Sequence, residues 1–347
     1  MRGKLLFLLV ITASVLLAGC STTQVTIPDA VAPSSPVISI PDEVRARILA
    51  MDPEQVSGSE VEEILSISPA PRVINIHGGI YPVHVVMESF SEFLVGMGYP
   101  EDRVRNPGDG SWSFSCYENS KKIAGAIAWY YEQEGMRPLM VGHSQGGMQA
   151  VKVLHELAGS FSPEIAVWNP LTGKAEQRYK IREPLTGQPT PVVGLHVSYA
   201  TAVGAGGLTR FLPNQWKMRK KLRRVPDSVI EFTGFYMPGD LLGGDNLGYG
   251  SSNYYEPVGS AMVRNVQLSS GHNHFNAPST RHLLDSQEII DWINNYEPAD
   301  TPTPEVKFDS DSSNILWAAD VWFSIKKHWV LELQRLISAQ REPAYAD

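Results

Sequence analysis

The feature that most constrains this chain is a Gly-x-Ser-x-Gly sequence placed directly after a short apolar run. The run covers residues 138–141, the motif is Gly-His-Ser-Gln-Gly at 142–146, and helix-compatible sequence follows at 148–155. This order predicts a strand, a very sharp turn and a helix, with Ser144 in a strained conformation at the turn. Gly142 and Gly146 would let the strand and the helix approach closely because they carry no Cβ. The helix N-terminus would then point free N–H groups at negative charge beside the serine oxygen. Ser144 is therefore the predicted nucleophile.

The first twenty residues indicate export. Arg2 and Lys4 precede an apolar run from Leu5 to Leu17, which is too short to span a membrane. The run ends in Leu-Ala-Gly-Cys at 17–20, which resembles the lipobox of bacterial lipoprotein signal peptides. The resemblance implies cleavage before Cys20, a diacylglyceryl thioether on its sulfur and an acyl group on its new amine. Ser21 at the next position resembles the outer-membrane sorting pattern.

These features divide the chain into four parts. We expect a signal peptide at 1–19, an extended tether rich in Ser, Thr and Pro at 20–41, a main domain at 42–298, and a linker with an amphipathic helix at 299–347. The helix, predicted over 314–336, carries several aromatic residues. They could contact lipid or a partner, or the helix could pack back on the domain as a brace.

Composition excludes some partners and bonds. The formal net charge is −8 and the sequence pI is about 5.6, which argues against nucleic acid as a partner. The chain has two cysteines, and lipidation of Cys20 would leave Cys116 alone. An intramolecular disulfide is then not expected, and Cys116 is interpreted as a small core residue.

Hydrophobic periodicity predicts an α/β fold. Strand-like runs occur at 72–76, 138–142, 164–168, 229–236 and 261–268, and helical patterns occur at 42–50, 59–65, 120–134 and 280–294. Strands that alternate with helices favour a mostly parallel sheet flanked by helices.

Three motifs in sequence order resemble the α/β-hydrolase superfamily over about residues 70–298. A strand runs into His-Gly-Gly at 77–79, a Gly-Tyr-Pro at 98–100 leads to Pro-Gly-Asp-Gly-Ser at 107–111, and the serine motif follows. The resemblance implies an α/β-hydrolase fold with a cap insertion at about 171–226. It also implies that the backbone N–H groups of Gly79 and Gln145 form an oxyanion hole.

The same resemblance suggests the partners of the nucleophile. The acid is expected just past the strand at 229–236, where Asp240 is the candidate and Asp245 its rival. The base is expected a few residues past the last strand, where His272 is favoured and His274 is the alternative. The order Ser, Asp, His is the one that this superfamily uses.

Together these features predict an exported, lipid-anchored serine hydrolase. It would cleave carboxylic esters, of acyl or lipid type, through an acyl-enzyme formed by Ser144, Asp240 and His272, with no metal or organic cofactor. We expect it in the bacterial cell envelope, anchored by its lipidated N-terminus, with the outer membrane as the expected site, facing the periplasm or the cell surface. The alternative is a non-catalytic envelope lipoprotein that uses the same fold as a binding module.

Overall fold

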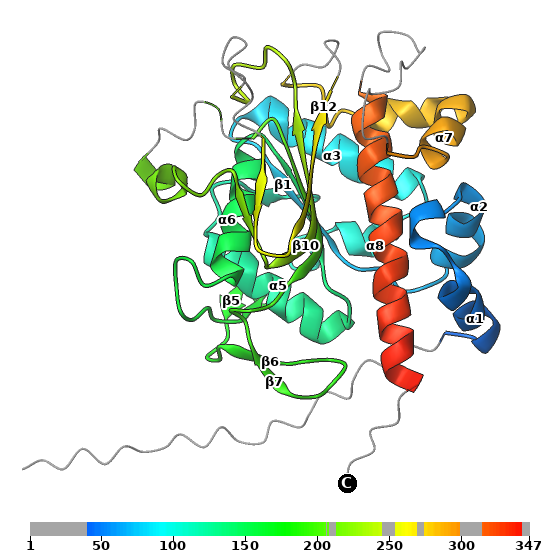
Figure 1. The fold of residues 1–347 in the computed structure, drawn as a ribbon, viewed down its shortest axis with the longest axis horizontal. Coiled ribbons are helices and arrows are strands. Elements are labelled where there is room, and N and C mark those ends of the chain that lie inside the picture. Colours follow the sequence, from blue (N-terminus) through cyan, green and yellow to red (C-terminus); the bar gives the residue numbers. More distant parts are fainter. Residues whose placement is uncertain are drawn as a thin grey trace, which may run out of the picture. The chain divides into compact units, whose positions relative to one another are not determined.

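A six-stranded sheet in which every neighbouring pair is parallel forms the centre of the molecule (Figure 1). The structure is a computed structural model that describes residues 40–205, 207, 213–244, 254–268, 274–298 and 314–341. The sheet order is β12-β10-β8-β3-β1-β2. The strands are β1 (Val73–His77), β2 (Phe114–Ser115), β3 (Leu139–His143), β8 (Val197–Val203), β10 (Val229–Tyr236) and β12 (Met262–Gln267).

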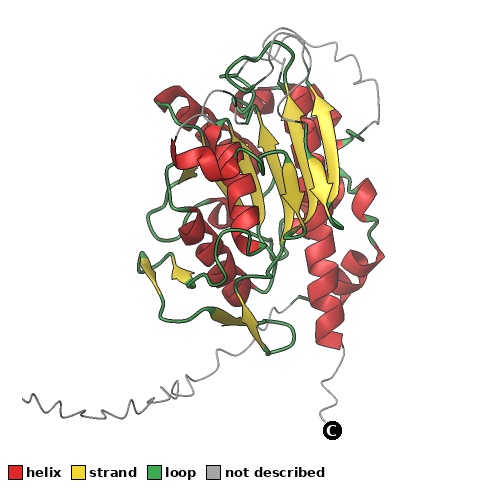
Figure 2. Cartoon of the chain, turned by 60° about the vertical axis from the view of Figure 1, so that its left-hand side comes forward, coloured by secondary structure: helices red, strands yellow, loops and turns green. Residues whose placement is uncertain are grey.

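Helices cover both faces of the sheet, which makes three layers (Figures 1 and 2). On one face lie α5 (Ser120–Glu134) and α6 (Gln145–Leu157); the other carries α3 (Tyr81–Gly96), α7 (Gln287–Asn294), α8 (Ile315–Arg341), α1 (Asp42–Ala50) and η2 (Val61–Leu65). Successive side chains of a strand point to opposite faces, so Val73 packs in one core and Ile74 in the other. Double burial explains why β3 and β8 are continuous buried runs.

The remaining elements are short and lie at the ends or edges of these layers. They are η1 (Pro53–Gln55), α2 (Gly58–Glu60), α4 (Glu101–Val104), β4 (Trp168–Asn169), β5 (Lys174–Ala175), β6 (Lys180–Arg182), β7 (Pro189–Pro191), η4 (Pro213–Met218), β9 (Arg224–Pro226), β11 (Glu256–Val258) and η5 (Arg281–Asp285).

The predicted α/β architecture with a mostly parallel sheet is confirmed, but two details of the sequence interpretation are wrong. The run at 164–168 is not a strand of the sheet: Ile165 and Val167 are buried in irregular backbone, and only the short β4 follows, antiparallel to β5. The predicted cap at 171–226 contains β8, which lies between β3 and β10 in the main sheet. The apolar run at 164–168 buries its side chains in the core but does not hydrogen bond to a strand of the main sheet. The position between β3 and β10 belongs to β8.

Helix α8 packs back on the domain, as the brace interpretation of the sequence expected, and is part of the main core. Its three tryptophans, Trp317, Trp322 and Trp329, are all fully buried, in the cluster that includes α3 and α7. They are therefore not available to a lipid surface or a partner in this structure. Among the described residues, no helix combines the length and apolarity needed to cross a membrane.

Buried ion pairs tie α8 to the strands beneath it. Asp320 is fully buried and accepts two hydrogen bonds from the guanidinium of Arg264 on β12, at 2.5 and 2.6 Å. Glu231 on β10 lies 2.7 Å from Lys327 and 3.3 Å from His328. Burial would by itself raise the pKa of Glu231, but hydrogen bonds from His328 and Lys327 and their positive charge lower it to about 2.

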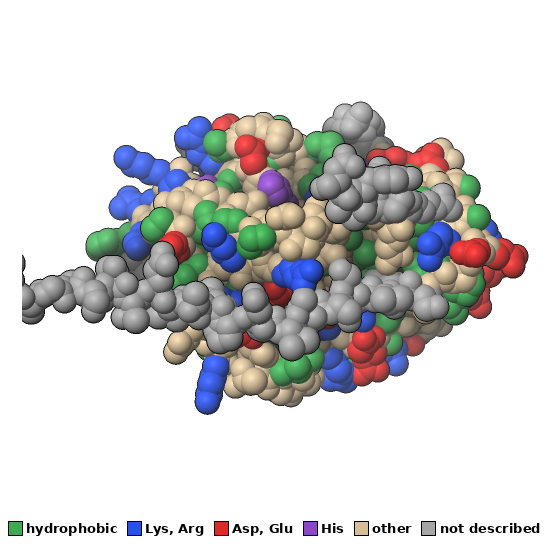
Figure 3. Space-filling model, turned by 90° about the horizontal axis from the view of Figure 1, so that it is seen from below, with side chains coloured by type: hydrophobic (Ala, Val, Ile, Leu, Met, Phe, Trp, Pro, Cys, Tyr) green, Lys and Arg blue, Asp and Glu red, His purple; other side chains and the backbone are tan. Residues whose placement is uncertain are grey.

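The end of the molecule opposite the carboxyl ends of the strands is a mixed surface. Figure 3 looks onto that end, and in the part coloured by type, basic, acidic and apolar side chains are interspersed. The described residues visible on this end thus carry charges of both signs.

We expect Glu231→Gln to lower the free energy of unfolding at pH 7 by on the order of 3 kcal/mol, because the variant removes a carboxylate that two partners stabilise. The pKa of Glu231 is lower in the folded protein than its ordinary value of 4.5. Its stabilisation is therefore complete above pH 4.5 and is lost as the pH falls towards 2. Urea unfolding at pH 7 and pH 3 measures both effects. The exposed Glu256→Gln is the control, with an expected change within about 0.5 kcal/mol; an equal loss in both variants would contradict the assignment.

Candidate active site

The site begins at the junction of β3 and α6. Strand β3 ends at His143, α6 starts at Gln145, and Ser144 alone forms the turn between them. Its φ is +55°, and it is the one non-glycine residue with positive φ among those that the structure describes. The Ser144 N–H donates to the carbonyl of Val203 on β8 at 2.9 Å. The predicted strained turn is confirmed, and a strained residue held by its neighbours is typical of a functional site.

Glycines are required here because backbone atoms fill the space that side chains would need. A Cβ on Gly146 would lie 2.1 Å from the carbonyl oxygen of Ile76 on β1. A Cβ on Gly142 would lie 2.6 Å from the carbonyl oxygen of Gly146. Both distances are far shorter than a van der Waals contact. The backbone of α6 therefore approaches β1 and β3 so closely that only glycine fits at these two positions.

A histidine connects Ser144 to an aspartate. Nε2 of His274 lies 2.8 Å from Oγ of Ser144, and Nδ1 of His274 lies 2.9 Å from Oδ2 of Asp240. A carboxylate only accepts hydrogen bonds, so Nδ1 donates to Asp240, and in the tautomer with its proton on Nδ1 the Nε2 atom accepts from the serine hydroxyl. Asp240 and His274 are both buried. Ser144, His274 and Asp240 therefore have the arrangement of a nucleophile, a base and its orienting acid.

Of the two candidate bases, the structure describes His274, the alternative to the favoured His272. The resemblance set only an approximate spacing after the last strand, and two histidines fell within it. His274 hydrogen bonds to Ser144, while His272 lies outside the described residues. Asp240 is the acid that contacts the histidine; its rival Asp245 and the lipidation candidate Cys20 also lie outside the described residues.

Both oxygens of the Asp240 carboxylate have partners. Oδ2 accepts from His274, and Oδ1 accepts from the N–H of Gly243 at 2.8 Å. A Cβ on Gly204 would lie 3.1 Å from Oδ2 and 3.2 Å from Nδ1 of His274. The carboxylate is thus fixed by its own loop and packed against the loop after β8.

His143, directly before Ser144, hydrogen bonds to the backbone of His274. The sequence did not predict this contact. The Nε2–H of His143 donates to the backbone carbonyl of His274 at 2.7 Å, and the two rings lie 5.3 Å apart. Burial lowers the pKa of His143 to about 3, so the ring is neutral. In the described part of the chain its Nδ1 has no hydrogen-bond partner. The serine motif pointed to position 143, but a contact across 131 residues leaves no local pattern.

The two residues predicted to supply the oxyanion donors are in contact through the side chain of Gln145. A Cβ on Gly79 would lie 2.5 Å from Oε1 of Gln145, and a Cβ on Gly78 would lie 2.9 Å from the Cβ of Ser144. The turn after β1 is therefore in contact with the start of α6. The N–H of Gln145 is at the first position of the helix, where it has no partner within the helix. The hydroxyl of Tyr117 donates to the carbonyl of Gly79 at 2.8 Å and fixes that turn from outside.

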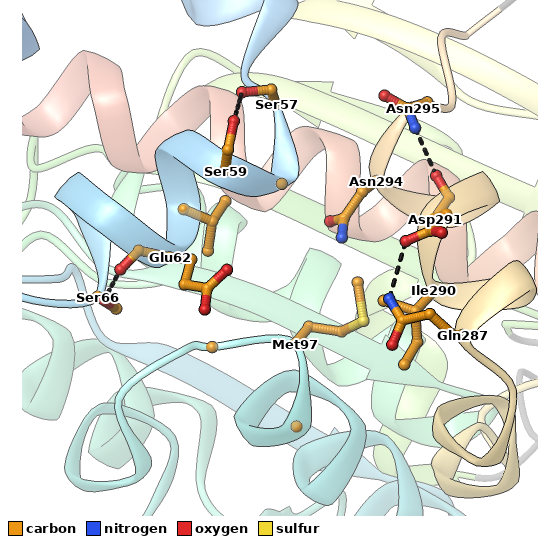
Figure 4. Close-up of a pocket in the computed structure, with 14 residues that line it drawn as sticks. Ser57, Ser59, Glu62, Ser66, Met97, Gln287, Ile290, Asp291, Asn294 and Asn295 are labelled. Atoms are coloured by element: carbon orange, nitrogen blue, oxygen red, sulfur yellow. Dashed lines mark hydrogen bonds between the residues drawn. The ribbon is translucent and has the colours of Figure 1, made fainter.

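A cavity of about 530 Å³ opens elsewhere, between α2 and η2 on one side and α7 on the other (Figure 4). None of the residues of the serine site lines it. Its polar side chains bond to one another: Ser57 to Ser59 at 3.1 Å, and Gln287 to Asp291 at 2.8 Å (Figure 4). These groups serve the local structure.

The described residues offer no group of three or more His, Cys, Asp or Glu side chains that could hold a metal ion. A scan against models of known protein families finds no match for this chain, and a search of curated proteins finds no significantly similar sequence. The function is therefore argued from the geometry of the site.

We expect Gly146→Ala to lower the free energy of unfolding by more than about 3 kcal/mol, because the added methyl group meets a rigid backbone carbonyl. The control is Gly110→Ala, at a residue with φ +72° and nothing within 4 Å of the new Cβ. There only the left-handed backbone is strained, at a cost of about 1–2 kcal/mol. Urea unfolding of both variants gives the comparison. Equal losses would mean that α6 does not approach β1 as closely as described.

Proposed function

We propose that this protein is a serine hydrolase that cleaves carboxylic esters through an acyl-enzyme. The observation that carries the proposal is the hydrogen-bonded series from Ser144 through His274 to Asp240, at 2.8 and 2.9 Å, on a strained turn between β3 and α6. Residues held in a strained backbone conformation by their surroundings cluster at active sites and ligand-binding sites.

The proposed reaction uses each residue at a stated atom. Nε2 of His274 takes the proton of Ser144 as Oγ attacks the ester carbonyl, and Asp240 stabilises the charge that forms on the ring. The N–H groups of Gly79 and Gln145 hold the negative oxygen. The tetrahedral intermediate collapses, and His274 gives its proton to the leaving alcohol. Water then attacks the acyl-serine by the same steps and releases the acid.

The sheet order supports membership of the α/β-hydrolase fold. Ser144 follows β3, Asp240 follows β10 and His274 follows β12, so all three come from the carboxyl ends of strands of the same parallel sheet, with β8 between β3 and β10. In open parallel sheets these ends meet at one edge, where ligands bind. The motifs at 77–79, 107–111 and 142–146 occur in the order that this fold uses.

Apolar residues beside the site favour an acyl substituent. An exposed apolar side chain comes directly after three of the site residues: Ile80 after Gly79, Leu241 after Asp240 and Phe275 after His274, with exposed fractions of 53%, 52% and 42%. Exposed apolar groups that gather around a polar centre are typical of a surface that binds apolar ligands. They support an ester of a carboxylic acid with an apolar chain, including a lipid ester.

A non-catalytic binding protein is the second candidate. It accounts for the fold and for an anchored location, but it gives no reason for the buried side chains of Asp240 and His274 to align on Ser144. The experiment below separates the two candidates.

We expect Ser144→Ala and His274→Gln to reduce hydrolysis of nitrophenyl butyrate by about 10³-fold or more, because each removes a group that acts in the transition state. His272→Gln should retain most of the activity. The assay uses the chain from residue 21 onward, with circular dichroism to verify folding, and fluorophosphonate labelling at Ser144 as an independent readout.

Two other outcomes would contradict this expectation. Loss in His272→Gln but not in His274→Gln would move the base to His272. No turnover and no labelling of the folded protein would favour the binding protein.

We further propose that Cys20 carries the lipid that anchors the protein to the bacterial envelope, with the outer membrane as its site. The support is the lipobox-like Leu-Ala-Gly-Cys after the apolar run, followed by Ser21. We expect the full chain to incorporate labelled palmitate and to partition with the outer-membrane fraction. Cys20→Ser should do neither, whereas Cys116→Ser, at a buried cysteine, should do both. Label retained in Cys20→Ser would contradict the anchor.

A further inference from the structure

A polar cavity of about 470 Å³ lies beside the serine site, at the carboxyl end of β2. His77 and Ser115, which end β1 and β2, belong to its wall, together with the loop before β2, the start of α5 and the turn after β4. Its volume falls within the range of about 300–1,000 Å³ typical of small-molecule sites.

The sheet register fixes how far this cavity lies from the nucleophile. Ser115 pairs with His77, and Ile76 pairs with Gly142, so Ser115, His77 and His143 lie in one row across three strands. Neighbouring strands are about 4.8 Å apart, so Ser115 lies about 10 Å from His143, the residue before the nucleophile. A group bonded to the reacting ester could span this distance. His77 is also the residue before Gly78, whose missing Cβ would touch Ser144.

The charges around the cavity exclude an anionic ligand. Lys122 is the one Lys or Arg in the wall, and it is paired with Glu118 at 2.5 Å. Burial lowers the pKa of His77, which favours its neutral form. The carboxylate of Asp109 accepts from the N–H and the hydroxyl of Ser111, at 3.0 and 2.7 Å. No unpaired cation is left in the wall for a phosphate or a carboxylate.

The wall suits a ligand with both polar and apolar surface better than an acyl chain. Its serine, threonine, asparagine and acidic side chains would lose hydration without new hydrogen bonds if a hydrocarbon chain covered them. Its apolar part comes from Phe114, Trp168, Pro170 and Leu171. Ser113 also lines the cavity, and within the described part of the chain its buried Oγ has no hydrogen-bond partner. Trp168 is half-buried, and Nζ of Lys122 lies over its ring, 4.9 Å from the centroid.

We propose that this cavity binds the alcohol part of the ester, and that this alcohol is a sugar or another neutral polyhydroxylated group. A sugar ring has an apolar face that packs on an indole and hydroxyl groups that bond to serine and carboxylate oxygens. The acyl part then lies towards the apolar residues after Gly79, Asp240 and His274. The inference rests on the proposed hydrolase function. In that reaction His274 gives its proton to the sugar oxygen as the carbonyl–oxygen bond breaks, and the free sugar leaves.

Two esters with the same acyl group test the inference: an acetyl ester of methyl glucoside and hexyl acetate. We expect kcat/KM to be at least tenfold higher for the sugar ester, and free cellobiose to inhibit hydrolysis of hexyl acetate. Trp168→Ala should bring the ratio of the two kcat/KM values close to one, chiefly through a higher KM for the sugar ester. The matched control is Trp216→Ala, an exposed tryptophan outside the cavity wall, which should leave the ratio unchanged.

The outcomes separate the two proposals. Hydrolysis of both esters at equal kcat/KM, without inhibition by cellobiose, would overturn the sugar subsite and leave the hydrolase intact. No hydrolysis of either ester would overturn the hydrolase; calorimetric titration of cellobiose into the folded protein then decides the subsite, and absence of heat would overturn it as well. If Trp168→Ala does not fold, the inhibition of the unmodified protein by cellobiose still decides.

Discussion

The structure depends on the close approach of α6 to β1 and β3. Gly146 leaves no room for a Cβ beside the carbonyl of Ile76, and Ser144 accepts a positive φ so that strand and helix can meet at that distance. The approach puts the start of α6 against the turn at Gly79, so the serine and the proposed oxyanion donors are set by backbone packing. Contacts between side chains tolerate small adjustments, whereas two backbones in direct contact, with no room for a Cβ, do not. The positions of Ser144 and of the proposed oxyanion donors are therefore fixed by the fold itself.

His274 and Asp240, the proposed base and acid, are positioned in a different way, by hydrogen bonds between the loops that carry them. Asp240 is held by the N–H of Gly243, and His274 is held at its ring by Asp240 and at its carbonyl by His143. His143 and Ser144 are consecutive residues. Ser144 and, through the hydrogen bond to His143, His274 are therefore both attached to the carboxyl end of β3. A displacement of that strand end would carry both groups together and preserve their hydrogen bond.

Sequence reasoning predicted the elements whose signals are local. The strand, turn and helix around Ser144 follow from five consecutive residues, and Asp240 follows from its place after a strand. It failed where the decisive contact is distant. The apolar run at 164–168 has the composition of a strand but forms no ladder in the main sheet, where β8 lies in the centre. Nothing local separates His272 from His274, and of these two the structure describes only His274, which hydrogen bonds to Ser144. The role of His143 could not be predicted for the same reason.

Helix α8 gives the domain a property that concerns its synthesis. The helix buries three tryptophans and forms ion pairs with side chains of β10 and β12. It also reaches the segment before β3, where Glu332 accepts hydrogen bonds from the backbone N–H and the side chain of Arg137. The central strands thus lack a large part of their core until α8, which follows every strand of the sheet in the sequence, has been made. Translocation machinery threads unfolded polypeptides. For a protein proposed to cross a membrane, a core completed by α8 favours a chain that stays open until that helix can pack.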